Sequence, residues 1–307
     1  MIGLEIEEIN FIKIFFTAVI IYLGVTIGFL SFGQNLLTNF LRQTVCYGKL
    51  VDNASNLFIS RLEVPKRWFR HFYIFAAPLS MFALYLVTNK YFYNKEIPNY
   101  IFDILDLSLG KQRETSVPPA NTIFALILLT GHLTKRLYET QSVNVFSDAK
   151  INIAHYLITF LHYSSLMIII LGESEGIVKD SEVNWENSLQ LKDWFAGLIF
   201  ILMTYEQLKT NQILSNLRKN ENGIVVTKEY KIPQGRLFNY ISSPLQLTEI
   251  AVYGALQIIL SDSSSYLFIY LWIVENQFLC AFLSHQWNKK NFKNYPQSRK
   301  IIIPFLL

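Results

Sequence analysis

The sequence predicts an all-α integral membrane protein with about seven transmembrane helices, and three observations point to this fold class. The chain of 307 residues is 51% hydrophobic and only 16% charged, a composition typical of membrane-embedded proteins. Its apolar residues gather in stretches close to the roughly 20 residues that cross a bilayer as a helix. Its basic residues gather in alternate connections between those stretches. We therefore expect one membrane-embedded domain over residues 1–307.

Seven apolar stretches are the candidate membrane helices. The fifth is short and closes around Glu206, and the polar sequence SDSSS forms a tight turn between the sixth and the seventh. The first follows acidic residues and precedes no small-residue cleavage site, so we expect a retained helix and not a cleaved signal peptide. The candidates are Ile14–Phe32, Phe72–Thr88, Val117–Thr134, Ile151–Leu171, Trp194–Leu208, Ile241–Leu260 and Ser265–Trp287.

The charge of the connections sets the expected orientation. Seven spans put the termini on opposite sides of the membrane, and Lys and Arg concentrate in residues 33–71, 135–150, 209–240 and the tail after Trp287. Because cytosolic connections are enriched in Lys and Arg, we expect a lumenal or exterior N-terminus and a cytosolic C-terminus. The basic tail is explained by this orientation alone, or by a cytosolic pocket for an anionic ligand.

Polar residues interrupt several of the apolar stretches. Glu249 lies in the sixth stretch, and Glu275 and His285 lie in the seventh. At the end of the third, Lys135 and Glu139 have the spacing of a helical ion pair. Each intramembrane residue has a plain alternative as a helix–helix hydrogen bond or as a side chain that reaches the membrane surface. Because ionisable residues within spans tend to be functional, together they predict a polar cavity that opens to the cytosol.

A carboxylic acid stands just before a proline in the sequence RLEVPKRWFRHFY. Glu63 precedes Val64 and Pro65, and a proline holds the residue before it in an extended conformation. A carboxyl beside an apolar wall can stay protonated and donate to a substrate oxygen. The alternative is a salt bridge from Glu63 to Arg67, and the sequence leaves both open.

Several kinds of site are not expected. The chain contains no G-x-G-x-x-G, P-loop, H-E-x-x-H or G-x-S-x-G sequence, so any nucleotide is bound without a Rossmann unit. Cys46 and Cys280 lie far apart and predict two free thiols, with neither a disulfide framework nor a metal site. The formal charge of +4 is small for a nucleic-acid-binding protein.

Motifs spread over nearly the whole chain carry a family resemblance. They are YGK at residues 47–49, EVPKRWFRHFY at 63–73, HLTKRLYET at 132–140 followed by VNVFS at 143–147, ILSNLRKN at 213–220, YKIPQGRLFNYISSP at 230–244 and AFLSHQWNKKNFKNYPQSRKIIIPFLL at 281–307. Taken together, they resemble the steroid 5α-reductase family, and within it the polyprenol (polyprenal) reductase branch.

The resemblance implies a reductase of the endoplasmic-reticulum membrane that uses NADPH to saturate a carbon–carbon double bond conjugated to a carbonyl. The implied substrate is a long-chain isoprenoid in membrane lipid, and neither nucleic acid nor an obligate protein partner is expected. Glu63 matches the catalytic acid of the family, and no metal is implied. Cytosolic cofactor-binding loops are implied mostly within residues 132–307, with contacts from Asn211, Arg218, Tyr230, Lys231, Glu249, His285, Tyr295, Arg299 and Lys300.

The same resemblance explains the end of the chain. The sequence YPQSRK is expected to help enclose the cofactor, and IIIPFLL is expected to pack back as an apolar plug. Pro304 cannot continue a helix, so we expect the plug to turn there.

The chain departs from the family pattern at several positions. Leu245 and Gln246 replace a polar–aromatic pair, Asn288 replaces a Tyr and Lys231 replaces an Arg. Leu133 stands where the steroid branch has a substrate-facing Tyr, which weakens the steroid interpretation and leaves the hydrogen-bond partner of the acid unidentified. The alternatives are a steroid 5α-reductase that acts on Δ4-3-ketosteroids and a non-catalytic lipid-binding membrane protein.

Overall fold

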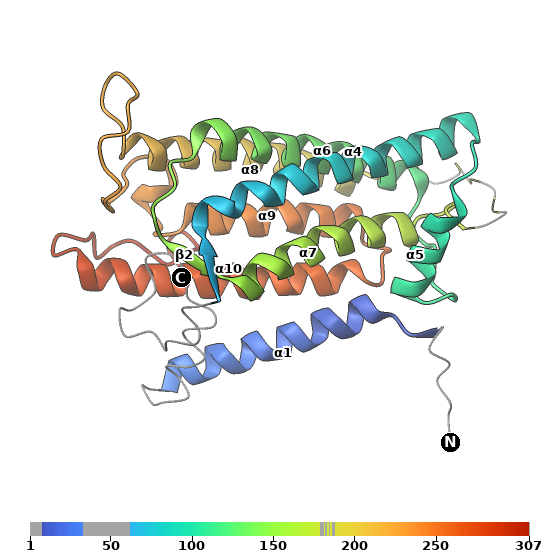
Figure 1. Cartoon of the computed structure of the whole chain (residues 1–307), viewed down its shortest axis with the longest axis horizontal. Helices are drawn as coiled ribbons and strands as arrows, with labels where there is room; N and C mark the ends of the chain where they lie inside the picture. The colour runs from blue at the N-terminus through green and yellow to red at the C-terminus, as the bar shows by residue number, and fades with distance from the viewer. Residues whose placement is uncertain are drawn as a thin grey trace.

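The long helices of the computed structural model lie side by side along the longest axis of the molecule (Figure 1). The structure describes residues 8–32, 62–178, 181, 183, 185 and 188–306. The α-helices are α1 (Phe11–Phe32), α4 (Phe69–Tyr93), α5 (Asn99–Leu109), α6 (Pro119–Tyr138), α7 (Ile153–Gly172), α8 (Leu191–Asn216), α9 (Pro244–Ile259) and α10 (Tyr266–Asn291). The shorter elements are strands β1 (Glu63–Pro65) and β2 (Lys150–Asn152), 3-10 helices η3 (Lys66–Trp68) and η5 (Arg236–Asn239), and the π-helical turn η4 (Glu139–Val143).

Each of the seven predicted apolar stretches is a helix, which confirms the all-α membrane fold. In the described part of the chain, α1, α4 with η3, α7 and α10 are long and apolar enough to cross a membrane. Helices α6 and α8 do not meet that criterion, and α9 has only 16 residues. The count of seven spans therefore stays a prediction.

The connections gather at two ends of the bundle. One end, here called the basic end, holds residues 62–68, 139–152, 217–243 and 292–306, and it includes the pairing of β1 with β2. The other, the serine end, holds residues 94–118, 173–178 and 260–265. This arrangement agrees with the predicted grouping of the basic connections, while residues 33–61 lie outside the described residues.

Helix α8 is longer than predicted. The prediction ended it at Leu208 and placed residues 209–240 in a loop, whereas the helix continues to Asn216. Thr210, Asn211 and Ser215 are buried against neighbouring elements. Because helical stability in proteins comes mostly from such packing, the helix persists where hydropathy no longer predicts it.

A two-stranded antiparallel ladder, which the sequence did not predict, joins the starts of α4 and α7. Its register pairs Glu63 with Asn152, Val64 with Ile151 and Pro65 with Lys150. Val64 is extended and buried, as the following proline predicts. The ladder fixes the segment that carries Glu63 against the segment that begins α7.

A buried carboxylate organises the serine end. Glu173, with 1% of its surface exposed, accepts hydrogen bonds from the hydroxyls of Ser263, Ser264 and Ser265 and from the backbone N–H of Ser265. The predicted tight turn SDSSS between α9 and α10 is confirmed. The negative charge also lies at the N-terminus of α10, where the helix dipole favours it.

Helix α5, which the sequence did not predict, packs on the end of α7 at the serine end. A Cβ added to Gly172 would lie 2.3 Å from Leu109 Cδ1, so any larger residue there would displace the end of the Leu109 side chain. Arg113 Nε donates to the carbonyl of Gly172 at 2.9 Å and fixes the same contact.

Large apolar side chains cover the outside of the bundle. On α8, Trp194, Phe195, Leu198, Ile201 and Leu202 are each more than half exposed. Water does not favour so continuous an apolar face, whereas lipid tails accept it. The exposed face therefore supports contact of α8 with the membrane interior.

The apolar tail packs back only in part. Ile302 is buried, whereas Phe305 and Leu306 are each 77% exposed. The chain turns at Pro304, as predicted. The Phe305 ring instead lies 5.4 Å from the ring of Tyr240. The expectation of a plug was therefore right for Ile302 and wrong for Phe305 and Leu306.

Candidate active site

Two adjoining cavities lie toward the basic end of the bundle. The polar cavity has a volume of about 430 Å³ and is enclosed by α8, the starts of α4 and α9, the end of α10 and the connections around them. The aromatic cavity, of about 140 Å³, lies among α4, α7, α9 and α10. Small-molecule sites usually have volumes of about 300–1,000 Å³, and the polar cavity falls in that range.

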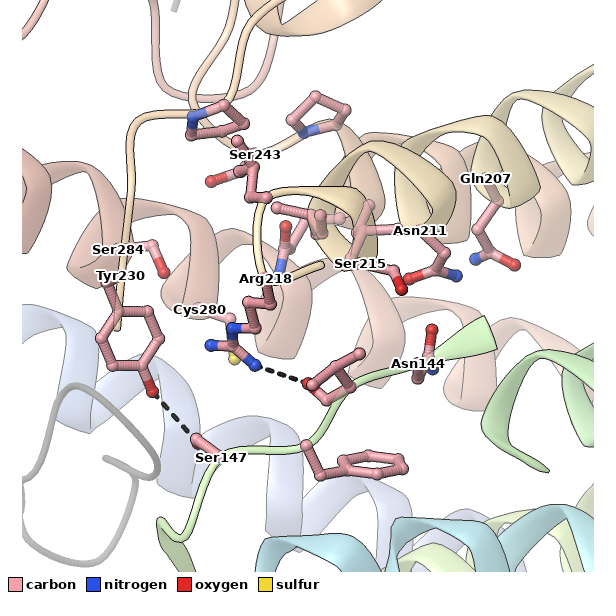
Figure 2. A pocket seen from close by; sticks show the side chains of 18 of the residues that line it. Asn144, Ser147, Gln207, Asn211, Ser215, Arg218, Tyr230, Ser243, Cys280 and Ser284 are labelled. Carbon is pink, nitrogen blue, oxygen red and sulfur yellow. Dashed lines mark hydrogen bonds between the residues drawn. The ribbon is translucent and has the colours of Figure 1, made fainter. Parts of the chain in front are cut away.

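One face of α8 supplies a polar wall (Figure 2). Gln207, Asn211 and Ser215 recur every four residues, so one side of the helix presents them. Arg218 follows in the turn just after the helix and lines the same cavity. The buried Nδ2 of Asn211 has no hydrogen-bond partner in the described part of the chain, and neither has the Oγ of Ser243. Because both residues line the cavity, these two atoms are available to hydrogen-bond with a ligand there.

The connection after η4 forms the opposite wall, and α8 holds it in place. Ser215 Oγ donates to the Val143 carbonyl at 2.7 Å, and Arg218 Nη1 donates to the Val145 carbonyl at 2.5 Å. The guanidinium of Arg218 also lies 5.3 Å from the centre of the Tyr230 ring. π-Helical turns such as η4 occur frequently at functional sites.

The structure brings several predicted cofactor residues together on the wall of the polar cavity. They are Asn211, Arg218, Tyr230, Lys231 and Glu249. Arginine and lysine side chains provide charged donors, and the unpaired amide and hydroxyl add neutral ones. This set of donors fits a phosphorylated nucleotide cofactor.

The other predicted cofactor residues stand behind that wall. The hydroxyl of Ser242, which lines the cavity, lies 2.5 Å from His285 Nδ1 and 2.6 Å from the Tyr295 hydroxyl. Arg299 Nη2 donates to a backbone carbonyl of the lining segment before α9. Lys300 pairs through its backbone with the same segment, and its side chain is exposed. These four residues hold the lining segments in place.

A network of charged and amide side chains, here called the charge network, connects α6, η4, α8 and α9 beside the polar cavity. Fully buried Glu139 lies 2.6 Å from Arg136 and 3.3 Å from Lys135, which confirms the predicted pair of Lys135 and Glu139. Lys135 Nζ donates to Gln207 Oε1, and Gln207 Nε2 donates to Glu249 Oε2, each at 2.5 Å. Two cations thus balance two carboxylates, which offsets the penalty of burying them.

The aromatic cavity is lined by rings from several helices. Phe72, Tyr163, Tyr253 and Trp272 contribute to its wall, and His162 Nε2 lies 3.3 Å from the Tyr253 hydroxyl. A wall of rings with a few polar groups suits an apolar ligand that has one polar end.

Glu63 lies on β1 and is not among the residues that line either cavity. Its carboxylate is 4.0 Å from Lys150 Nζ on β2. Within the described residues, Glu63 and Arg67 form no ion pair, so the predicted alternative was wrong, because the ladder places Lys150 nearer. Lys66, three residues further along, does line the polar cavity. The catalytic role of Glu63 stays a prediction.

Glu275 and the cysteines have simpler surroundings. Glu275 faces Gly24 of α1, and it lines neither of the two cavities. Cys280 is buried, forms no disulfide among the described residues and lines the polar cavity. Cys46 and the YGK motif lie outside the described residues.

Three polar residues on these walls, Tyr73, Gln207 and Ser243, were not predicted as site residues. Gln207 precedes Asn211 by four residues, a spacing that would have indicated one helix face if α8 had been predicted to continue. Tyr73 follows Phe69 by four residues at the end of the EVPKRWFRHFY motif, so the two side chains lie on one face of a helix. This spacing could have indicated that Tyr73 lies on the same wall as Phe69.

An apolar helical bundle with a polar cavity beside an aromatic one is the architecture of a membrane-embedded protein with a ligand site between its helices. The sequence model of the 3-oxo-5-alpha-steroid 4-dehydrogenase family matches residues 149–307. The polyprenal reductase of Drosophila melanogaster is 33% identical over 315 residues, which covers 99% of this chain and 95% of the relative.

Further relatives carry the same name. The polyprenal reductase of Caenorhabditis elegans is 33% identical over 85% of each chain, and that of Homo sapiens is 31% identical over 80% of this chain and 78% of its own. This protein belongs to the 3-oxo-5-alpha-steroid 4-dehydrogenase family, the steroid 5α-reductases. It is therefore an oxidoreductase that acts on a CH–CH group, and its family implies a nicotinamide cofactor.

Proposed function

We propose that this protein reduces the α double bond of polyprenal with NADPH and produces dolichal, a step in dolichol synthesis for N-glycosylation. Its relatives named polyprenal reductase support the substrate, since the chain spans nearly the whole length of one of them. The observation that carries the proposal is the wall shared by the polar and aromatic cavities. A hydride donor in one and an alkene in the other would meet at that wall, already oriented for reaction.

The chemistry favours the aldehyde over the alcohol. Hydride adds readily to an alkene only when the resulting negative charge can be delocalised. The conjugated carbonyl of polyprenal accepts that charge on its oxygen, where a hydrogen-bond donor stabilises it. Polyprenol, an allylic alcohol, offers no such oxygen, so separate enzymes would interconvert alcohol and aldehyde.

The size of the aromatic cavity favours an isoprenoid over a steroid. Its 140 Å³ is smaller than the roughly 300 Å³ at the lower end of sites that enclose drug-sized ligands. It suits the short reactive end of a long chain, with the remaining isoprene units in lipid. A rigid steroid nucleus would need more enclosed space.

The polar cavity supplies the proposed NADPH contacts. NADPH would supply the hydride. Arg218 and Lys231 would hold its phosphates, the 2′-phosphate included. Arg299 and Lys300, which the resemblance also names, would support these contacts from behind the wall. Asn211 Nδ2 and Ser243 Oγ would find their missing partners on the cofactor. Under the resemblance, Glu249 would lie at the nicotinamide half, held there by Gln207.

The family resemblance also proposes Glu63 as the catalytic acid. Its side chain is 14% exposed and lies beside buried Val64, surroundings in which a carboxyl can stay protonated. Glu63→Gln keeps the shape and removes the acid, and this variant tests the assignment.

We propose that the protein resides in the endoplasmic-reticulum membrane with a lumenal N-terminus and a cytosolic C-terminus. The gathering of the basic connections at one end supports this orientation. A glycosylation tag placed after Leu307 should stay unmodified, whereas a tag near Lys111 at the serine end should be glycosylated. A glycosylated C-terminal tag would contradict the orientation.

The decisive experiment gives the purified protein NADPH with polyprenal, polyprenol or a Δ4-3-ketosteroid in separate reactions and follows products by mass spectrometry. Dolichal from polyprenal alone is the expected result. Direct conversion of pure polyprenol to dolichol would contradict the aldehyde assignment. Reduction of the steroid alone would support the steroid alternative, and no turnover with any substrate would support a lipid-binding protein.

A further inference from the structure

We propose that the hydroxyl of Tyr73 contacts the carbonyl oxygen of the substrate and stabilises the negative charge that forms on it. The proposal rests on the function proposed above and names a residue for that reaction. It assigns Tyr73 as a catalytic residue on α4, at the wall between the two cavities.

The shared wall limits the candidates. Phe69, Tyr73, Glu249 and Gln277 line both cavities. Hydride transfer requires the donor and the acceptor carbon to be in contact, so the reacting atoms lie at this wall. The carbonyl oxygen is separated from the β-carbon only by the α-carbon and the carbonyl carbon. Its hydrogen-bond donor must therefore also lie at the wall or next to it.

Among the four residues of the shared wall, the chemistry favours Tyr73. Tyr163, whose ring lies 5.9 Å from the Tyr73 ring, also has an O–H group but lines only the aromatic cavity. Phe69 has no polar atom, and a charged Glu249 offers only acceptors, one of which Gln207 already occupies. The Gln277 amide can donate, but no contact between Gln277 and a Lys or Arg side chain is found among the described residues. Tyr73 has an O–H group beside a buried cation.

Arg136 prepares that hydroxyl to donate. Its Nε and Nη2 donate to the Tyr73 oxygen at 3.0 and 2.8 Å, and its guanidinium lies 4.8 Å from the centre of the Tyr73 ring. These two bonds occupy the acceptor capacity of the phenol oxygen, which leaves it the donation of its own proton. The Tyr163 hydroxyl is a side-chain hydrogen-bond neighbour of Tyr73, so a substrate oxygen would take the place of that contact. The adjacent positive charge also favours negative charge on an oxygen bound to this hydroxyl.

The charge network fixes Arg136 in this position. Its Nη1 donates to Glu139 Oε2 at 2.6 Å, and Glu139 is fully buried. A donor held in this way needs no reorganisation when the charge develops, which is the condition under which such donors accelerate a reaction most.

The reaction balances without consuming the Tyr73 proton. Hydride from NADPH forms a C–H bond at the β-carbon, the α–β π-bond breaks, and its electron pair moves through the α-carbon to the carbonyl oxygen. Tyr73 donates a hydrogen bond to that oxygen and keeps its own O–H bond. A proton from an acid or water then forms the α-carbon C–H bond and restores the carbonyl, so polyprenal, NADPH and one proton give dolichal and NADP⁺.

The test compares Tyr73→Phe with the unmodified protein at saturating NADPH and polyprenal. We expect kcat to fall by about 10²-fold, the size measured for removal of a single oxyanion donor, with unchanged affinity for NADPH. Tyr85→Phe is the matched control, because Tyr85 lies on the same helix with its side chain 61% exposed, and we expect it to have no effect.

A binding measurement separates the catalytic role from a structural one. The carboxylic acid of the same isoprenoid carries negative oxygens where the enolate oxygen would form. In the presence of NADP⁺, Tyr73→Phe should weaken binding of this acid roughly 10–100-fold, as expected for a lost hydrogen bond to a charged group. Tyr73→Phe also removes the acceptor of two Arg136 N–H groups, so we expect a lower unfolding temperature. A cooperative unfolding transition together with unchanged affinity for NADPH shows that the fold is intact.

Two results would overturn the assignment. One is a Tyr73→Phe protein with unchanged kcat and unchanged affinity for the acid. The other is an equal loss of affinity for NADPH, which would place the hydroxyl at the cofactor. Failure of the proposed function is recognised separately, because the unmodified protein would then not reduce polyprenal at all. If Gln277→Met shows the losses expected of Tyr73→Phe and Tyr73→Phe does not, the donor is Gln277.

Discussion

The two ends of the bundle bury their polar groups in different ways. At the serine end, three serine hydroxyls and one backbone N–H surround the carboxylate of Glu173. At the basic end, the charge network is paired, but Asn211 Nδ2 and Ser243 Oγ on the cavity wall have no partner. A saturated cluster stabilises the fold, whereas unpaired atoms around a cavity mark the place where a ligand completes the hydrogen bonds.

This comparison predicts that substitutions at the basic end change kinetics and that substitutions at the serine end change stability. The largest expected effect is that of Glu63→Gln, which should lower kcat roughly 10²–10³-fold if Glu63 is the acid. The measurement is steady-state reduction of polyprenal, with NADPH binding followed separately. The protein should still fold and bind NADPH.

Lys150→Ala is the control for that variant, because it removes the ion-pair partner of Glu63 and leaves the acid in place. We expect it to retain most activity, since an exposed pair of this kind contributes little stability. If Glu63→Gln is as active as Lys150→Ala, then Glu63 only pairs with Lys150 across the two strands. Glu63 would then not belong to the basic-end residues whose substitution changes kinetics.

The second prediction concerns the cofactor. Arg218→Ala should raise the KM for NADPH roughly 10–100-fold, the range of one charge-assisted hydrogen bond, and should leave the KM for polyprenal unchanged. Lys192→Ala at the serine end, where Lys192 contacts Ser261, is the matched loss of a cation and should change neither constant. Equal use of NADPH and NADH by the unmodified protein would contradict this phosphate pocket.

The third prediction tests the serine end. Glu173→Gln replaces one of the two acceptor oxygens with an NH₂ group, so the two donors at that oxygen lose their acceptor and meet another donor. The change should destabilise the protein by about 1–3 kcal/mol. Thermal unfolding in detergent measures the loss, and kcat should not change. A lower kcat at full stability would show that the serine end also serves catalysis.

Glu175→Gln is the control for that substitution. Burial and the nearby carboxylate of Asp262 raise the pKa of Glu175. A raised pKa means that the folded state disfavours the charged form. The neutral glutamine should therefore leave stability unchanged or raise it slightly, with the gain present above the raised pKa and absent at lower pH.

The smallest expected effect is that of Tyr91→Phe. The Tyr91 hydroxyl donates to the carbonyl of Glu175 at 2.7 Å and joins α4 to the serine end. Its removal should lower the free energy of unfolding by about 0.5–1.5 kcal/mol and leave both KM values unchanged. A change in the KM for polyprenal would show that the two ends are coupled through α4.

The helices were predictable wherever the local pattern of apolar residues is sufficient to specify a helix. The seventh apolar stretch, predicted as Ser265–Trp287, is observed as Tyr266–Asn291, because a long apolar run between polar turns has few alternatives to a helix. The end of α8 was not predictable in this way. Its polar residues around Asn211 remain helical only because other elements bury them.

The candidate site shows the same division. The resemblance named Arg218 and Tyr230, and the structure places both on the cavity wall. It also named His285 and Tyr295, which reach that wall only through Ser242. Matching a motif identifies residues near a site, but not which of them present an atom to the ligand, because that depends on packing between helices.

By itself, the sequence determined the helical membrane class, the positions of seven apolar segments, the gathering of basic residues in alternate connections and the family. These properties follow from local hydropathy, charge and motif, which neighbouring residues carry. Only the tertiary structure decided that Tyr73, Gln207 and Glu249, from three different helices, meet around two adjoining cavities. The physical reason is that a cavity wall is formed by side chains packed across helices, and no single stretch of sequence contains that packing.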